Sequence, residues 1–151
     1  MADDDPSVQV RRVAENLLTR REHTQQELTF KLQRRGFEPS IIANVIHQLQ
    51  QENLQSDSRF VEAYIYARTQ KGYGPIKIQQ ELQQRGIDRD LIKHYLALHA
   101  AQWPVLAQAA KTKRFGNNPS RDMAERAKQQ RFLHYRGFTA EHIVTVFEDG
   151  Q

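Results

Sequence analysis

Leu-Gln-Arg-Arg-Gly-Phe, at residues 32–37, is a stretch that occurs three times in this chain in related forms. Leu-Gln-Gln-Arg-Gly-Ile follows at residues 82–87, and Leu-His-Tyr-Arg-Gly-Phe at residues 133–138. The glycines Gly36, Gly86 and Gly137 lie 50 and 51 residues apart. Each copy has Leu four residues before its glycine, Arg directly before it and a large apolar residue directly after it. Repetition at a fixed period of this length indicates a tandem-repeat architecture.

The pattern predicts a helix, a tight turn and a second helix in each copy. Glycine just past the end of a helix can adopt the left-handed conformation that closes it, and the apolar residue that follows can fold back onto that helix. The next helix then has apolar residues at offsets that fall on one helical face. These residues are Ile42, Val45 and Ile46 in the first copy, Ile92, Tyr95 and Leu96 in the second, and Ile143, Val146 and Phe147 in the third.

Helix signals also precede each motif. We expect a first helix over residues 8–21, and a capping box at Thr24–Glu27 that opens the second helix. In the second copy a helix starts at Asp57 or Ser58 and is broken at residues 72–75, where Pro75 opens the next one. In the third copy we expect a helix from Pro104 to Gly116, and a long basic helix that starts at Asn118–Pro119 and runs to about Arg136.

The sequence therefore predicts an all-α fold of three tandem three-helix repeats that form an elongated, curved array. The expected spans are an acidic, disordered tail over residues 1–6 and repeats over residues 7–54, 55–101 and 102–149. Several small cores suit a chain of 151 residues with only 38% hydrophobic residues. We expect packing roles for the aromatic and apolar residues Phe37, Ile87, Phe138, Tyr64, Tyr66 and Trp103.

Composition limits the kind of protein this chain can be. It has no cysteine, which excludes disulfides and thiolate metal sites. No apolar run approaches the roughly 20 residues of a membrane span, and the acidic N-terminus lacks the apolar stretch of a signal peptide. We therefore expect a cytoplasmic protein without membrane association, and a monomer.

Positive charge is concentrated near the C-terminus. The net charge is +4 and the sequence pI is about 9.5. Residues 111–136 contain eight Lys or Arg and two acidic residues. A basic segment of this kind suits a polyanionic partner, either nucleic acid or an acidic protein surface.

Two groups of residues are candidates for binding. The first is Arg68, Lys71, Tyr73 and Lys77, where the tyrosine could stack on a base or a partner's side chain, or could simply pack the turn. For the second group we favour a binding role over that of an ordinary charged helix surface; its members are Lys111, Lys113, Arg114, Arg126, Lys128 and Arg131. Arg35, Arg85 and Arg136 precede the turn glycines, and we expect them to stabilise the ends of helices through the helix dipole.

No catalytic constellation is recognisable in the sequence. Gly72-Tyr73-Gly74 fails as a dinucleotide fingerprint, because no strand precedes it and Lys77 occupies the place of the third glycine. His94 and His99 lie five residues apart, on different sides of a helix, without partner ligands. We expect no enzymatic activity, no cofactor and no metal.

Residues 68–82, which read Arg-Thr-Gln-Lys-Gly-Tyr-Gly-Pro-Ile-Lys-Ile-Gln-Gln-Glu-Leu and are followed by Arg-Gly-Ile at 85–87, resemble the central motif of the RecX family. Residues 113–116 and 133–138 resemble the third repeat of that family, and the similarity extends from about residue 13 to 147. The resemblance implies a regulator that binds the RecA recombinase and its filament on single-stranded DNA. It implies restraint of ATP hydrolysis, strand exchange and co-protease activity, in recombination and the SOS response.

Two alternatives remain open at this stage. One is a helical protein that binds DNA directly, without RecA, and does so with a steep dependence on salt. The other is a protein–protein scaffold whose basic residues have no effect on DNA. The sequence does not decide whether the polyanion is phosphate or an acidic protein surface.

Overall fold

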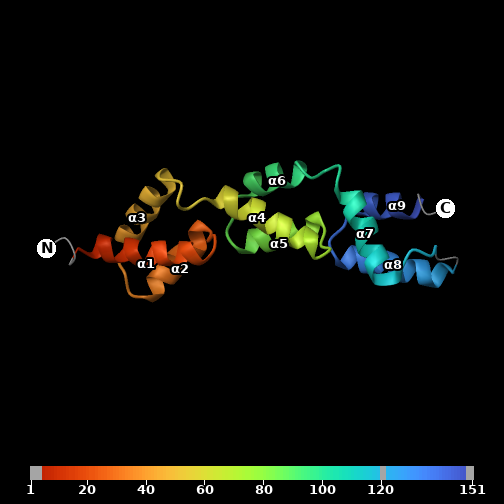
Figure 1. Ribbon diagram of the computed structural model, residues 1–151, viewed down its shortest axis with the longest axis horizontal. Helices are drawn as coiled ribbons and strands as arrows, with labels where there is room; N and C mark the ends of the chain where they lie inside the picture. Colours follow the sequence, from red (N-terminus) through yellow and green to blue (C-terminus); the bar gives the residue numbers. More distant parts are fainter. Residues whose placement is uncertain (1–4, 120–121, 149–151) are drawn as a thin grey trace. The chain divides into compact units, whose positions relative to one another are not determined.

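Nine α-helices and no strands make up the part of the chain that the structure describes. The structure is a computed structural model, and it describes residues 5–119 and 122–148. The helices, labelled in Figure 1, are α1 (Pro6–Arg20), α2 (Gln25–Arg34), α3 (Pro39–Gln51), α4 (Asp57–Gln70), α5 (Pro75–Gln84), α6 (Arg89–Ala97), α7 (Trp103–Phe115), α8 (Met123–Tyr135) and α9 (Ala140–Glu148). The all-α prediction is confirmed.

The chain divides into two compact units. The first contains the residues up to Glu62 together with Gln83–Asp88, and the second contains Ala63–Leu82 and the residues from Arg89 onward. The turn at 83–88 belongs to the first unit because Gly86 lies directly against α2. A Cβ atom added to Gly86 would lie 1.6 Å from Oε1 of Gln26.

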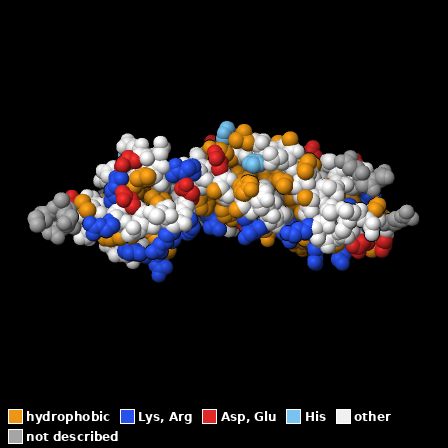
Figure 2. Space-filling view, in the orientation of Figure 1, with side chains coloured by type: hydrophobic (Ala, Val, Ile, Leu, Met, Phe, Trp, Pro, Cys, Tyr) orange, Lys and Arg blue, Asp and Glu red, His pale blue; other side chains and the backbone are white. Residues whose placement is uncertain are grey.

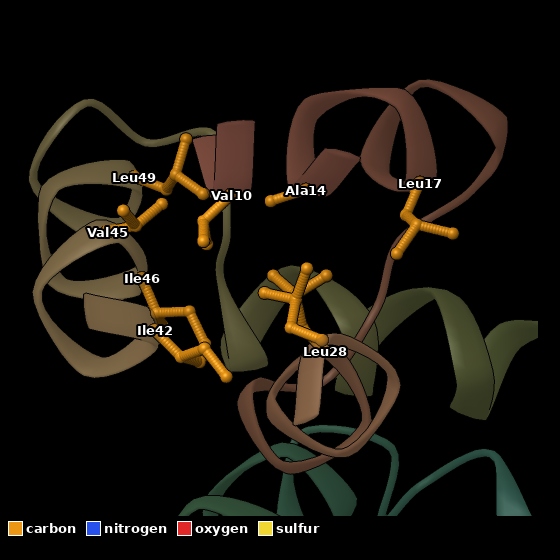
Figure 3. Close-up of a cluster of buried hydrophobic side chains, with 9 residues drawn as sticks. Val10, Ala14, Leu17, Leu28, Ile42, Val45, Ile46 and Leu49 are labelled. Atoms are coloured by element: carbon orange, nitrogen blue, oxygen red, sulfur yellow. The ribbon is translucent and has the colours of Figure 1, made fainter. Parts of the chain in front are cut away.

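Helices α1, α2 and α3 enclose the core of the first unit. Figure 3 shows side chains from all three helices pointing toward one another: Val10, Ala14 and Leu17 from α1, Leu28 from α2, and Ile42, Val45, Ile46 and Leu49 from α3. All are at most 8% exposed. The helical spacing seen in the sequence therefore forms a small, closed core.

The three predicted glycine turns are confirmed. Gly36, Gly86 and Gly137 have φ values of +87°, +80° and +96°, a region that residues with a Cβ atom rarely adopt. The residues after the last two turns, Ile87 and Phe138, are buried. Each turn thus closes one helix, and the residue after the first turn, Phe37, is partly buried against the core of the first unit.

Caps set the helix boundaries, and two of them differ from the sequence expectation. Asp5 accepts a hydrogen bond from the Ser7 amide, so α1 begins at Pro6; of the tail expected over 1–6, residues 1–4 lie outside the described residues. Helix α8 does not begin at Asn118–Pro119. It begins at Met123, because the Asp122 carboxylate accepts the amide hydrogen of Ala124 and caps the helix there.

Other boundaries agree with the sequence. Thr24 caps α2 by accepting the Glu27 amide hydrogen, but the Glu27 side chain pairs with Arg21, so only half of the expected capping box forms. Pro75 opens α5, as predicted. Tyr66 is a correction among the expected packing residues, since 65% of it is exposed.

Candidate functional site

Two turns in the second unit meet through main-chain atoms. The turn between α4 and α5 contains Gly74, and the turn between α8 and α9 contains Gly137. The Gly74 amide donates to the Arg136 carbonyl at 2.7 Å, and the Ile76 amide donates to the Gly137 carbonyl at 2.9 Å. This approach is possible because Gly74 has no side chain: a Cβ there would lie 2.6 Å from the Gly137 carbonyl oxygen. The pairing fixes the α8–α9 turn against the α4–α5 turn.

Tyr73 lies beside this junction, surrounded by cations. The guanidinium carbon of Arg68 lies 3.9 Å from the centroid of the Tyr73 ring, that of Arg136 lies 4.8 Å away, and the Lys77 ammonium lies 5.2 Å away. Cations are attracted to an aromatic face at these distances. The structure therefore brings together three of the four residues of the first predicted group, and adds Arg136. With cations around it, Tyr73 fits the packing interpretation better than that of an open stacking surface.

The charge of Arg68 is used inside the protein. Its guanidinium donates two hydrogen bonds to the Glu81 carboxylate, at 2.9 and 2.8 Å, and the Tyr64 hydroxyl donates to the same carboxylate at 2.9 Å. The side chains of Arg68 and Glu81 are only 20% and 23% exposed. A bidentate ion pair of this kind holds the arginine in one orientation. Arg68 therefore positions Tyr73 rather than offering its charge to a ligand.

A basic pocket opens next to Tyr73. Its volume is about 290 Å³. The charged lining consists of Lys71, Lys113, Arg114 and Arg136, and the remaining lining residues are Thr69, Gln70, Gly72, Leu106, Ala109, Ala110 and Phe132. They come from the end of α4 and the turn after it, from α7, and from the end of α8 with its C-cap residue Arg136. In the described part of the chain no acidic residue lines this pocket. We call it the basic pocket below.

Arg136 is held rigidly at the wall of the basic pocket. One Nη donates to the Lys71 carbonyl at 2.9 Å, and the guanidinium lies 4.9 Å from the centroid of the Phe132 ring. A guanidinium has five N–H donors, so this hydrogen bond leaves others for a ligand. From the sequence we expected Arg136 to have a dipole role like those of Arg35 and Arg85. Its place in the basic pocket depends on the contact between residues 71 and 136. No local sequence pattern shows that these two residues lie side by side.

The second predicted group separates into distinct surroundings. Lys113, Arg114, Lys128 and Arg131 are exposed, and the first two line the basic pocket. Lys111 is only 6% exposed, with its ammonium 4.7 Å from the centroid of the Phe147 ring. It therefore does not lie on the basic surface on which we had placed it. The buried residues Trp103, Ala107 and Ala110 precede it on one face of α7, and this spacing was a signal for its burial.

Arg126 also contributes to packing. Its Nη2 donates to the Phe147 carbonyl at 3.3 Å, and its guanidinium carbon lies 5.3 Å from the centroid of the Phe147 ring. This places a cation at the C-terminal end of α9, where the helix dipole is favourable to it. Arg121, which belongs to the same basic segment of the sequence, lies outside the described residues.

Figure 2 shows Lys and Arg side chains (blue) in clusters over the second unit, with hydrophobic side chains (orange) between them.

Among residues 5–119 and 122–148, no three His, Cys, Asp or Glu lie close enough together to hold a metal ion. Within the same ranges, no helix combines the length and apolar character of a membrane span.

Comparisons with known proteins match all three repeats to one family. Residues 11–49 match the model "RecX, first three-helix domain", residues 56–96 match "RecX, second three-helix domain" and residues 105–147 match "RecX, third three-helix domain".

Relatives align over most of their length. The chain is 44% identical over 133 residues to the regulatory protein RecX of Legionella pneumophila (strain Corby), covering 88% of this chain and 89% of the relative. It is 43% identical over 139 residues to the regulatory protein RecX of Pseudomonas fluorescens (strain SBW25), covering 92% and 90%. The crystal structure of RecX from Lactobacillus salivarius has the same fold, with a TM-score of 0.81 at 22% identity, and the match covers 99% of this chain and 97% of that one.

Proposed function

The chain belongs to the RecX family of regulatory proteins, and from this premise we propose that it regulates the RecA recombinase. It binds RecA, above all the RecA filament on single-stranded DNA, as a monomer without catalytic chemistry of its own. It thereby restrains ATP hydrolysis, strand exchange and co-protease activity in recombination and the SOS response. The observation that supports this most directly is the match of all three repeats to the RecX domains.

The distribution of charge in the second unit supports a polyanionic partner. Lys71, Lys113 and Arg114 are exposed around one pocket, and no acidic residue of the described chain lines it. A filament on single-stranded DNA presents phosphates in a regular array, and a concave basic surface attracts them over long range. We propose that this side of the second unit faces the nucleoprotein filament.

Three linked repeats suit a regulator that acts at low stoichiometry. In the proposed division, repeats at 7–54, 55–101 and 102–149 each offer a modest contact surface. Contacts on one chain add their free energies, because after the first contact the others form at a high effective concentration. A protein attached to neighbouring RecA subunits stabilises one arrangement of them, and so opposes the changes that ATP hydrolysis and strand exchange require.

The test is RecA-catalysed ATP hydrolysis on single-stranded DNA, with this protein titrated from well below one molecule per RecA subunit. We expect hydrolysis to fall at substoichiometric amounts, and the protein to sediment with the filaments. Unchanged hydrolysis at one protein per RecA, with no cosedimentation, would contradict the proposal.

A second arm separates regulation of RecA from simple capture of DNA. A protein that only removes single-stranded DNA loses its effect when DNA is added in excess. Inhibition that persists in a large excess of DNA, with RecA limiting, therefore requires contact with RecA or its filament. Inhibition that disappears there would favour the direct DNA-binding alternative.

A further inference from the structure

We propose that the basic pocket is a binding site for the phosphate groups of a nucleotide, whose sugar and base lie against the apolar wall of the pocket. The ligand class is a nucleotide, either part of a single strand with two successive phosphodiesters or a free nucleoside triphosphate. The inference rests on the proposed function for its setting, because the single strand of a RecA filament offers such nucleotides. Its physical basis lies in the pocket itself.

The positive charge of the basic pocket is not compensated by acidic lining residues in the described part of the chain. In the described part of the chain, none of Lys71, Lys113, Arg114 and Arg136 forms an ion pair. This differs from Arg68, which neighbours the same junction and is neutralised by Glu81. Cations gathered in a concavity repel one another, and a bound anion relieves that repulsion.

The number and type of the cations in the basic pocket fit phosphate groups. A single carboxylate carries one negative charge, which four cations would overcompensate. Two successive phosphodiesters, or the phosphates of a nucleoside triphosphate, match the cations more closely. Arginine presents paired N–H donors that fit phosphate oxygens, and lysine adds a mobile point charge. The combination favours phosphate over an acidic side chain of a protein.

The size of the basic pocket and the rest of its lining suit a nucleotide. A volume of about 290 Å³ lies near the lower end of the range for small-molecule sites, roughly 300 Å³ and above, and exceeds what a bare phosphate needs. Leu106, Ala109, Ala110 and Phe132 form an apolar part of the lining. Such a wall suits a sugar or a base next to the phosphates, and guanidinium planes also stack on bases.

Contacts within the second unit hold the walls of the basic pocket in place. The pocket residue Arg136 is oriented by its hydrogen bond to Lys71 and by the rings of Tyr73 and Phe132. The main-chain pairing of the Gly74 and Gly137 turns fixes the distance between α4 and α8. A site whose walls are already fixed loses less entropy on binding.

The test measures direct binding to the whole chain in the absence of RecA. Three probes are used: fluorescein-labelled oligodeoxythymidylate by anisotropy, and ATP and inorganic phosphate by calorimetry. The pocket variant Lys113→Gln/Arg114→Gln is compared with Lys128→Gln/Arg131→Gln. Both variants remove two exposed cations, but only the first pair lines the pocket.

We expect the pocket variant to bind the oligonucleotide at least tenfold more weakly, and the control variant less than threefold more weakly. For a single strand, the slope of log K against log salt concentration is about −0.7 per phosphate contacted, so it should fall in magnitude by about 1.4 in the pocket variant. Binding of the oligonucleotide alone identifies the strand as the source of the phosphates, and binding of ATP with comparable affinity identifies the free nucleotide.

A second pair of variants tests the pocket by blocking it. Ala109→Glu places a carboxylate at an exposed position of the lining. Gln108→Glu places one at the preceding residue of α7, which does not line the pocket. We expect the first to abolish binding of the nucleotide probes and the second to reduce it only slightly. Circular dichroism confirms that each variant is folded.

Three outcomes would overturn the inference: no binding of either nucleotide probe to the parent, equal weakening in the pocket and control variants, or binding of inorganic phosphate alone. Each is independent of the proposed function. Inhibition of RecA can persist without a nucleotide site, and nucleotide binding can occur in a protein that leaves RecA unaffected.

Discussion

Replacement of Gly74 by alanine tests the main-chain junction between the two turns of the second unit. The new Cβ would lie 2.6 Å from three main-chain atoms, the carbonyl carbon and oxygen of Gly137 and the amide nitrogen of Phe138. Atoms of the main chain cannot rotate away as a flexible side chain can, so the turns must separate. Separation breaks the Gly74–Arg136 and Ile76–Gly137 hydrogen bonds.

The expected cost follows from those two hydrogen bonds. Each contributes about 0.5–1.5 kcal/mol, so Gly74→Ala should destabilise the second unit by about 1–3 kcal/mol. Gly72→Ala is the matched control, two residues away. Gly72 has a φ of +86°, and its added Cβ would meet only ordinary contacts at 3.6 Å. It should lose about 1–2 kcal/mol through left-handed strain while the junction stays intact.

Because the two free-energy ranges overlap, the deciding measurement is amide hydrogen exchange. In the parent, the Ile76 amide donates to the Gly137 carbonyl and should exchange slowly. Gly74→Ala should bring its exchange close to that of an exposed amide, whereas Gly72→Ala should leave it protected relative to the core of the same unit. A protected Ile76 amide in Gly74→Ala would show that the two turns stay joined, contrary to this prediction. Urea unfolding gives the accompanying free energies.

Three further predictions concern single side chains. Glu81→Gln should destabilise the second unit by about 1 kcal/mol and increase the mobility of Arg68, because the bidentate, charge-assisted pair between the two side chains is lost. Urea unfolding measures the loss of stability, and relaxation of the Arg68 Nε signal measures the mobility. Burial lowers the pKa of His23, which is 1% exposed and whose Nε2 lies 3.0 Å from the Lys31 ammonium. The first unit should therefore be fully stable above the unfolded histidine pKa of about 6.5, and lose stability as pH falls through the lower folded value; His23→Asn should remove that pH dependence in urea titrations. Lys111→Met should leave oligonucleotide affinity within twofold of the parent in the anisotropy assay, because this lysine is buried against Phe147.

The repeat architecture could be predicted because its determinants are local. A glycine with positive φ, an arginine before it and an apolar residue after it lie within six residues, and they act largely through the turn they form. The same is true of Pro75 at the start of α5 and of Thr24 as a cap. Such reasoning fails where the sequence offers two possible caps, as at α8, where the helix is capped by Asp122 and not by Asn118.

The candidate site could be predicted only in part. Arg68, Tyr73 and Lys77 lie within ten residues across one turn, so their proximity follows from the sequence. The basic pocket joins Lys71 to Arg136, which are 65 residues apart, and depends on how two turns meet. Residue type also misled the interpretation of Lys111, whose charge suggested exposure although its position on α7 continues the buried face.

The junction of Gly74 with Gly137 has a consequence for the exchange of parts between relatives. Because its hydrogen bonds join main-chain atoms, they do not require matching side chains on the two repeats. A third repeat transplanted from another member of the family should therefore dock without redesign of neighbouring residues, provided that both glycines, the spacing of their turns and the arginine that contacts Tyr73 are retained. Insertion of even one residue into either turn would shift the donors out of register with the acceptors, so chimeric boundaries belong in the α6–α7 connection instead.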